Sequence, residues 1–103
     1  MARNLLPLGS VVLLKDGTKR LVICGRIQAR AESDEIYDYS AALYPEGIVG
    51  PESMFFFNHE AIERVYFIGF QDEEELTYNK EVLSELGELE IRDGEIVEKD
   101  ENQ

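Results

Sequence analysis

The pattern with the greatest chemical potential in this chain is His59-Glu60-Ala61-Ile62-Glu63. It differs from the His-Glu-x-x-His zinc pattern only in its last residue, so His59 and Glu63 on one helical face could share a metal while Glu60 acts on a bound water. A catalytic zinc needs three protein ligands, and His59 is the only histidine in the sequence. We therefore interpret the pattern as an acidic helical turn with a half-exposed imidazole. We predict no metal site and no cofactor, and a metal-dependent hydrolase is the least favoured function.

A second candidate for catalysis is a thiolate–imidazolium pair made by Cys24 and His59. A reactive thiol needs an accessible, electropositive setting, whereas Cys24 follows the apolar residues 21–23. We predict a buried, inert thiol, and a single cysteine favours a reducing compartment. The sequence also lacks the nucleophile-elbow, P-loop and dinucleotide-binding patterns. We predict no catalytic residues and a protein that is not an enzyme.

The charge of the chain limits its partners. The net charge is −12, and residues 71–103 carry thirteen acidic side chains against three basic ones, whereas residues 1–70 carry nine against seven. A negative field of this size repels phosphate backbones and anionic lipid headgroups. The small basic group Lys15, Lys19 and Arg20 is interrupted by Asp16, and we interpret its members as solvated turn residues. Neither nucleic acid nor a membrane is an expected partner.

The N-terminus needs separate consideration because Arg3 precedes apolar residues, as in a signal peptide. Pro7, Gly9 and Ser10 interrupt that apolar run, and no small-residue cleavage site follows before Lys15. No segment approaches the roughly 18 uninterrupted apolar residues of a membrane span. We expect a cytoplasmic protein.

Short apolar runs separated by turn residues predict β-strands in residues 1–70. Residues 11–14 and 21–24 flank an Asp-Gly step and should form a hairpin, and residues 37–44 should form a third strand. Residues 54–57 and 65–68 predict two more strands, joined by a short helical turn with Asn58 as its N-cap.

The remainder of the chain predicts one helix and a hairpin. Residues 72–86 are predicted to form an acidic amphipathic helix. Asp72 is its N-cap, Glu75 completes a capping box, and Gly87 ends the helix. Residues 89–98 are a possible hairpin around an Asp-Gly turn, and residues 99–103 should fray. We predict a single α+β domain over residues 1–98. It should be a small twisted antiparallel sheet or partly open barrel, with one short helical turn and one packed amphipathic helix.

The aromatic residues favour a binding function. Strand alternation sends Phe56 to the face opposite Phe55 and Phe57, and Tyr66 to the face opposite Val65 and Phe67. A sheet with apolar groups on both faces must be covered twice, and the helix can cover one face. Either a partner protein or the loop over residues 45–53 covers the other. For a partner face, the candidate anchors are Phe56, Tyr66 and Tyr44.

Three stretches carry a resemblance to a known family. They are LPLGSVVLLKDGTKRLVICGR, YDYSAALYPEG and FFFNHEAIERVYFIGFQDEEE, which run from about Leu5 to Glu75. In them the chain resembles the domain of unknown function 4176, a family of small Firmicutes proteins. The most specific pieces are the Leu-Pro-x-Gly-Ser-Val-Val opening, the Tyr-Pro-Glu-Gly turn and the Phe-Asn-His-Glu motif, which contain Pro45, Gly47, Asn58, His59 and Glu60.

The resemblance implies a role in protein export. Members of that family are typically encoded near type VII secretion genes and the LXG-type toxins that these systems export. This implies a non-enzymatic chaperone or adaptor that binds an LXG-type toxin or its small helical targeting partner. The alternative is an immunity protein that neutralises a toxin domain, since an acidic surface suits a basic nuclease. The resemblance gives no established role to the motif residues, and the sequence does not set an oligomeric state.

Overall fold

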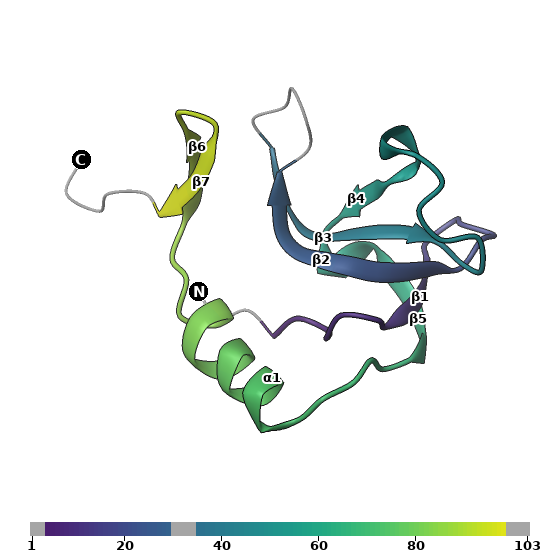
Figure 1. Cartoon of the computed structure of the whole chain (residues 1–103), viewed down its shortest axis with the longest axis horizontal. Helices are drawn as coiled ribbons and strands as arrows, with labels where there is room; N and C mark the ends of the chain where they lie inside the picture. Colours follow the sequence, from purple (N-terminus) through teal and green to yellow (C-terminus); the bar gives the residue numbers. More distant parts are fainter. Residues whose placement is uncertain (1–3, 30–34, 99–103) are drawn as a thin grey trace.

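The computed structural model describes residues 4–29 and 35–98. Five strands form one antiparallel sheet in the order β4-β3-β2-β1-β5 (Figure 1). They are β1 (Val11–Leu14), β2 (Leu21–Ala29), β3 (Ile36–Leu43), β4 (Phe55–Phe57) and β5 (Ile62–Phe67). Two 3-10 turns, η1 (Pro51–Ser53) and η2 (His59–Ala61), precede β4 and β5. The predicted α+β class with an antiparallel sheet agrees with this architecture, and the sheet is open, with β4 and β5 as its two edges.

The hairpin predicted at the start of the chain is confirmed. β1 pairs with β2 in a register that places Val11 opposite Val22. The turn closes with a hydrogen bond from the Gly17 N–H to the Leu14 carbonyl oxygen at 2.9 Å. Asp16, rather than Gly17, takes the left-handed conformation, with φ of 63°. Aspartate tolerates this conformation better than most residues, so the Asp-Gly signal marks the turn correctly.

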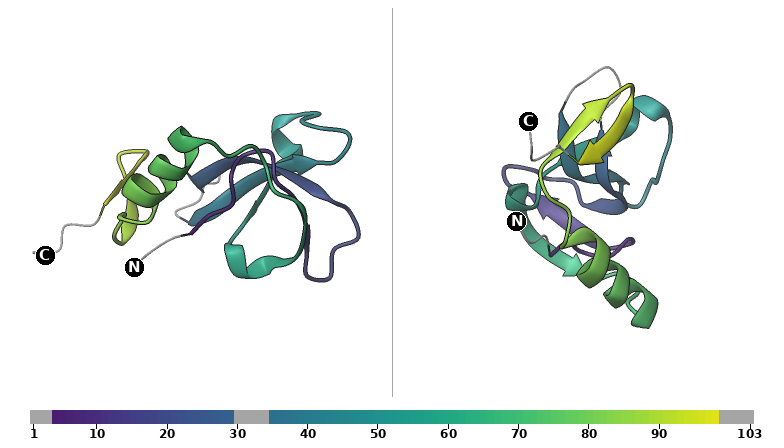
Figure 2. Two further views of the ribbon diagram at one scale, coloured as in Figure 1. Left: turned by 90° about the horizontal axis from the view of Figure 1, so that it is seen from below. Right: turned by 90° about the vertical axis from the view of Figure 1, so that its left-hand side faces the viewer.

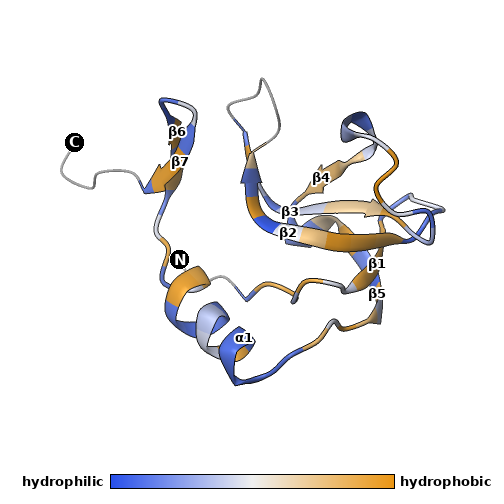
Figure 3. Ribbon diagram, in the orientation of Figure 1, coloured by the Kyte–Doolittle hydropathy of each residue, from blue (hydrophilic) through white to orange (hydrophobic). Residues whose placement is uncertain are grey.

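β2 bends in its middle, so that its second half runs at an angle to its first half (Figure 1). The register between β2 and β3 shifts between Ile23 and Gly25. A Cβ atom on Gly25 would lie 2.5 Å from the Ser40 Oγ, so only glycine fits there. Ile27 has a positive φ of 54°, which is a strained conformation for a β-branched residue. Figure 3 shows the apolar start of β2 beside β1 and a polar stretch at the bend.

The prediction of a buried Cys24 is wrong. Leu21 and Ile23 are buried, and alternation along β2 places Cys24 on the other side of the strand, where it is exposed. The apolar neighbours of Cys24 indicated a buried strand, but they do not indicate the face on which a residue lies. The thiol donates a hydrogen bond to the Val22 carbonyl oxygen at 3.3 Å.

The core lies on one face of the sheet and is completed by residues from both ends of the chain. Its buried members are Leu5, Val12, Leu21, Ile23, Tyr39, Ala41, Phe57 and Leu83. The N-terminal segment is held by the buried Ser10, whose Oγ donates to the Pro7 carbonyl oxygen and accepts from the Gly69 N–H. A Cβ on Gly69 would lie 2.0 Å from the Leu8 carbonyl oxygen, so this approach requires glycine.

The helix differs from the prediction in its packing. α1 (Glu73–Tyr78) continues into a π-helical segment, η3 (Asn79–Leu83), and the Asp72 cap is confirmed because its side chain accepts the Glu75 N–H at 2.9 Å. The expectation that the whole apolar stripe packs on the sheet is not confirmed: Leu83 is buried, whereas Leu76 and Val82 are exposed. Figures 1 and 2 show the helix beside the sheet rather than across its face. Only its last turn reaches the core.

The chain after the helix forms a two-stranded sheet of its own. β6 (Leu89–Arg92) and β7 (Glu95–Glu98) pair antiparallel, and the turn residues Asp93 and Gly94 have φ of 54° and 79°. Two consecutive positive φ values define the tight turn that matches strand twist. The tail over residues 99–103, predicted to fray, lies outside the described residues. Among the described residues, no helix has the length and apolar character needed to cross a membrane.

Candidate interaction surface

The edge strand β5 and the residue that follows it expose a continuous run of apolar side chains. Val65, Tyr66, Phe67 and Ile68 are 41%, 47%, 60% and 52% exposed. β5 pairs with β1 on one side and is the last strand of the sheet, so within the described residues no strand covers its other side. An uncovered edge presents backbone N–H and C=O groups that can pair with another extended chain. Apolar side chains and free backbone groups therefore occur together on β5.

Two of the predicted anchors meet on this surface around an arginine. The guanidinium carbon of Arg20 lies 5.3 Å from the centre of the Tyr44 ring and 5.5 Å from that of the Tyr66 ring. Arg64 also stacks on Tyr66, at 5.4 Å. Among the described residues, the ion pairs involve neither Arg20 nor Arg64. We call Arg20, Tyr44, Arg64 and Tyr66 the Tyr–Arg row; such side chains are enriched at the energetic centres of protein interfaces.

The structure does not bring the third predicted anchor to this surface. Phe56 is on β4, at the opposite edge of the sheet, and its ring lies 6.0 Å from that of Tyr37. Of its neighbours, Phe57 is buried and Phe55 is 41% exposed. Alternation separated these side chains by face, but it could not show that β4 and β5 lie at opposite edges.

The arginines of the row were not among the candidates found in the sequence. Arg20 was interpreted as a solvated turn residue, and Arg64 received no role. Arg64 and Tyr66 are two residues apart in β5 and so share a face, but the predicted strand begins at residue 65 and leaves Arg64 out. The contact between Arg20 and Tyr44 depends on pairing between strands, where the Tyr44 N–H donates to the Arg20 carbonyl oxygen at 2.9 Å.

The Asn58–His59 motif joins β3 to η2. The Asn58 Oδ1 accepts the Asp38 N–H at 3.0 Å, and the Asp38 carboxylate accepts the His59 N–H at 2.8 Å. Asn58 occupies the predicted N-cap position of η2, but its side chain makes no cap hydrogen bond. The side chains of Asn58 and Asp38 instead accept backbone N–H groups across the two segments, and these bonds fix the chain where it enters η2.

The imidazole of His59 is tied to the core through Tyr39. Its Nδ1 lies 2.6 Å from the Tyr39 hydroxyl oxygen, which also accepts the Leu6 N–H at 2.9 Å. Burial raises the pKa of Tyr39 to about 12. Tyr39 therefore stays protonated at neutral pH, and its hydroxyl can donate to His59 Nδ1 when the imidazole carries its proton on Nε2.

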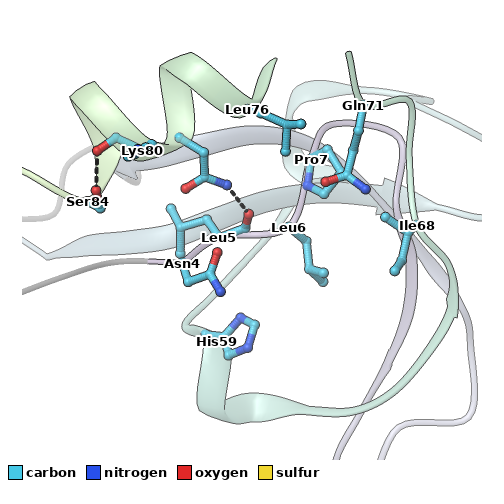
Figure 4. A pocket seen from close by; sticks show the side chains of 11 residues that line it. Asn4, Leu5, Leu6, Pro7, His59, Ile68, Gln71, Leu76, Lys80 and Ser84 are labelled. Carbon is cyan, nitrogen blue, oxygen red and sulfur yellow. Dashed lines mark hydrogen bonds between the residues drawn. The ribbon is translucent and has the colours of Figure 1, made fainter. Parts of the chain in front are cut away.

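A hollow of about 650 Å³ lies between this imidazole and the helix (Figure 4). Its lining includes Leu6, Ile68 and Leu76, and the Asn79 amide bridges the space by donating to the Leu5 carbonyl oxygen at 2.7 Å. Within residues 4–29 and 35–98, no three His, Cys, Asp or Glu side chains are arranged to hold a metal ion. Glu60 is exposed in η2, and Glu63 is exposed in β5.

Pro45 and Gly47 belong to the turn that follows β3. Gly47 has φ of 82°, and its N–H donates to the Leu43 carbonyl oxygen at 2.7 Å. Glycine adopts this left-handed conformation at no steric cost. The turn ends the strand immediately after Leu43 and so holds Tyr44 beside Arg20.

One ion pair that the sequence did not reveal joins the helix to the sheet. Arg26, at the bend of β2, makes two hydrogen bonds of 2.8 Å to the carboxylate of Glu75, and the two side chains are only 8% and 12% exposed. Arg26 also stacks on Tyr78 at 5.4 Å. The sequence predicts Glu75 as the second half of a capping box, but its side chain is used for this tertiary contact instead.

These features define a small open-sheet protein whose exposed edge has the composition of a protein-binding surface. The chain belongs to the family described as domain of unknown function 4176, whose model matches residues 5–78. The matched part includes the sheet, the Asn58–His59 motif and α1. Comparison with curated proteins and with solved structures gives no match.

Proposed function

We propose that this chain is a non-enzymatic, protein-binding accessory factor, specifically a cytoplasmic chaperone or adaptor for the export of LXG-type toxins by type VII secretion. One observation carries the binding function: the run Val65–Ile68 is exposed at the end of β5, a strand that has a free edge, and on the residue that follows it. Exposed apolar patches rimmed by polar groups mark interaction sites. The secretion setting rests on the typical gene neighbourhood of the family.

The geometry supports a particular mode of binding. An extended segment of the partner pairs with the outer edge of β5, and its side chains pack against Val65 and Phe67 or against the Tyr–Arg row. Backbone pairing supplies affinity that depends little on sequence, whereas Arg20 and Arg64 select for acidic side chains on the incoming strand. Covering the edge also protects the chain itself from association with other exposed strands.

The experiment is an affinity pull-down of the tagged protein from the cells that encode it, with secretion intact and partners identified by mass spectrometry. Wild type should recover an LXG-type toxin or its small helical companion, and Tyr66→Ala should lose it. Phe55→Ala is the matched control, because it removes an aromatic of similar exposure from the opposite edge of the sheet. Thermal melts of each variant establish that it is folded.

The outcomes separate the alternatives. Loss of the toxin in both variants would contradict a binding site on β5, and recovery of no secretion substrate by folded wild type would contradict the adaptor function. A captured toxin domain whose activity is abolished on co-expression would favour the immunity function instead.

A further inference from the structure

A second exposed surface lies where the chain after β5 meets the helix. Its apolar floor consists of Leu8, Phe70 and Tyr78, which are 48%, 78% and 45% exposed. A second hollow adjoins the first, because both are lined by Glu74 and Tyr78, and it reaches Val82, which is 42% exposed. We call this surface the acidic groove, because carboxylates form its rim. It is distinct from the edge of β5, since the two surfaces share no residue.

The rim carries negative charge that the described chain does not neutralise. Asp72, Glu73, Glu74 and Glu81 line the groove. The ion pairs formed by the described residues are Lys19–Glu46, Arg26–Glu75 and Arg92–Glu90, and none includes a rim carboxylate. Arg26, the one basic residue of the lining, is already paired with Glu75. The groove is therefore net negative beside an apolar floor.

The groove is also held in a fixed shape. The double hydrogen bond from Arg26 to Glu75 fixes the first turn of the helix against β2, and stacking on Arg26 positions Tyr78. Asp72 is fixed by its cap to the Glu75 N–H. A preformed site loses less conformational entropy on binding than one that must first be ordered.

We propose that the acidic groove binds a cationic segment of a partner protein, an inference that rests on the proposed protein-binding function. A bulky apolar side chain of that segment covers Phe70 and Tyr78, and Lys or Arg side chains on either side of it pair with Glu74 and Glu81. The charge of the rim excludes nucleic acid and anionic lipid as occupants. The partner thus presents a basic segment in addition to the strand that pairs with β5.

The test is a titration of the whole protein with a short acetylated and amidated peptide that has one central Phe flanked by Lys. A second peptide, with Glu in place of every Lys, is the ligand control. The Lys peptide should bind and the Glu peptide should not, and affinity should fall as salt is raised. Glu74→Lys with Glu81→Lys should weaken binding about tenfold or more. Phe70→Ala should weaken it without changing its salt dependence.

A matched double variant shows whether the change in net charge alone, rather than the loss of contacts in the groove, weakens binding. Glu52→Lys with Glu95→Lys makes the same change in net charge at exposed positions outside the groove and should bind like wild type. Equal loss in both double variants, or no binding of the Lys peptide, would overturn the inference. If the pull-down partner is recovered equally by wild type and the groove variant, the adaptor function stands and the groove inference fails. If the peptide binds the groove but wild type recovers no secretion substrate, the groove inference stands and the adaptor function fails.

Discussion

At the scale of single residues, Tyr39 connects the core to the family motif. Its side chain is fully buried, its ring lies 5.5 Å from that of Phe57, and its hydroxyl joins the Leu6 N–H to His59. This hydroxyl thereby links the N-terminal segment, β3 and η2. The imidazole that could have suggested a metal site instead shares a hydrogen bond with Tyr39, and this contact fixes the turn before β5.

The raised pKa of Tyr39 predicts a dependence of stability on pH. The pKa of Tyr39 is about 12 in the folded protein against the ordinary tyrosine value of 10.0, so the folded state holds the proton more tightly. The free energy of unfolding should therefore hold its full value below pH 10 and fall as pH rises towards 12, by up to roughly 3 kcal/mol. Urea unfolding across this range measures it. Tyr39→Phe should be less stable at neutral pH, and its free energy of unfolding should decline less steeply with pH than that of wild type. Equal declines in the two proteins would contradict the assignment of the pH dependence to Tyr39.

At the scale of elements, the helix is held by a few contacts rather than by a continuous apolar face. Leu83 enters the core, Asn79 bonds to the N-terminal segment, and Glu75 pairs with Arg26. Leu76 and Val82 contribute to exposed surfaces instead. The position of the helix, and with it the acidic groove, therefore depends on the bend in β2 that presents Arg26.

The Arg26–Glu75 pair should be important for stability because both side chains are largely removed from water. Arg26→Ala or Glu75→Ala should each lower the free energy of unfolding by about 3 kcal/mol, because each leaves the charge of the remaining residue buried and unpaired. The double variant should lose less than the sum of the two. Denaturant unfolding provides the measurement. Lys19→Ala and Glu46→Ala break a solvent-exposed pair and should each lower the free energy of unfolding far less than the Arg26 and Glu75 variants do; equal losses for the two pairs would argue against this role of Arg26.

At the scale of the whole molecule, the net charge and the open sheet edge have opposite effects on association between copies of the chain. The exposed β5 favours association between copies, whereas a net charge of −12 makes copies repel at neutral pH. The positive Tyr–Arg row lies at the edge, and the excess of acid lies after residue 70. A partner that covers the edge satisfies its backbone groups without bringing two negative chains together.

This opposition predicts that association between copies begins as the charge disappears. Lowering the pH towards the isoelectric point of about 4.4 should increase light scattering at fixed protein concentration. Tyr66→Lys should suppress the increase, because lysine on an edge strand discourages pairing. Tyr78→Lys is the matched control, since it adds the same charge at a tyrosine of similar exposure on the helix. If both variants suppress scattering equally, charge alone, and not the edge of β5, governs association.

Local signals in the sequence determined the elements of this protein. The Asp-Gly steps at residues 16–17 and 93–94 coincide with hairpin turns, and Asp72 begins the helix. These signals work because turn and cap geometry depends on neighbours within a few residues. The excess of acid after residue 70 is likewise visible in the sequence alone.

The tertiary structure alone decided which residues share a surface. The sequence placed Phe56 with Tyr44 and Tyr66, but strand order puts Phe56 at the far edge and adds Arg20 and Arg64 to the row. It likewise assigned Asn58 and Glu75 to local caps, whereas the fold gives their side chains partners 20 and 49 residues away. Such pairings depend on strand order, register and the bend in β2, which arise from packing of the whole chain and which no local pattern encodes.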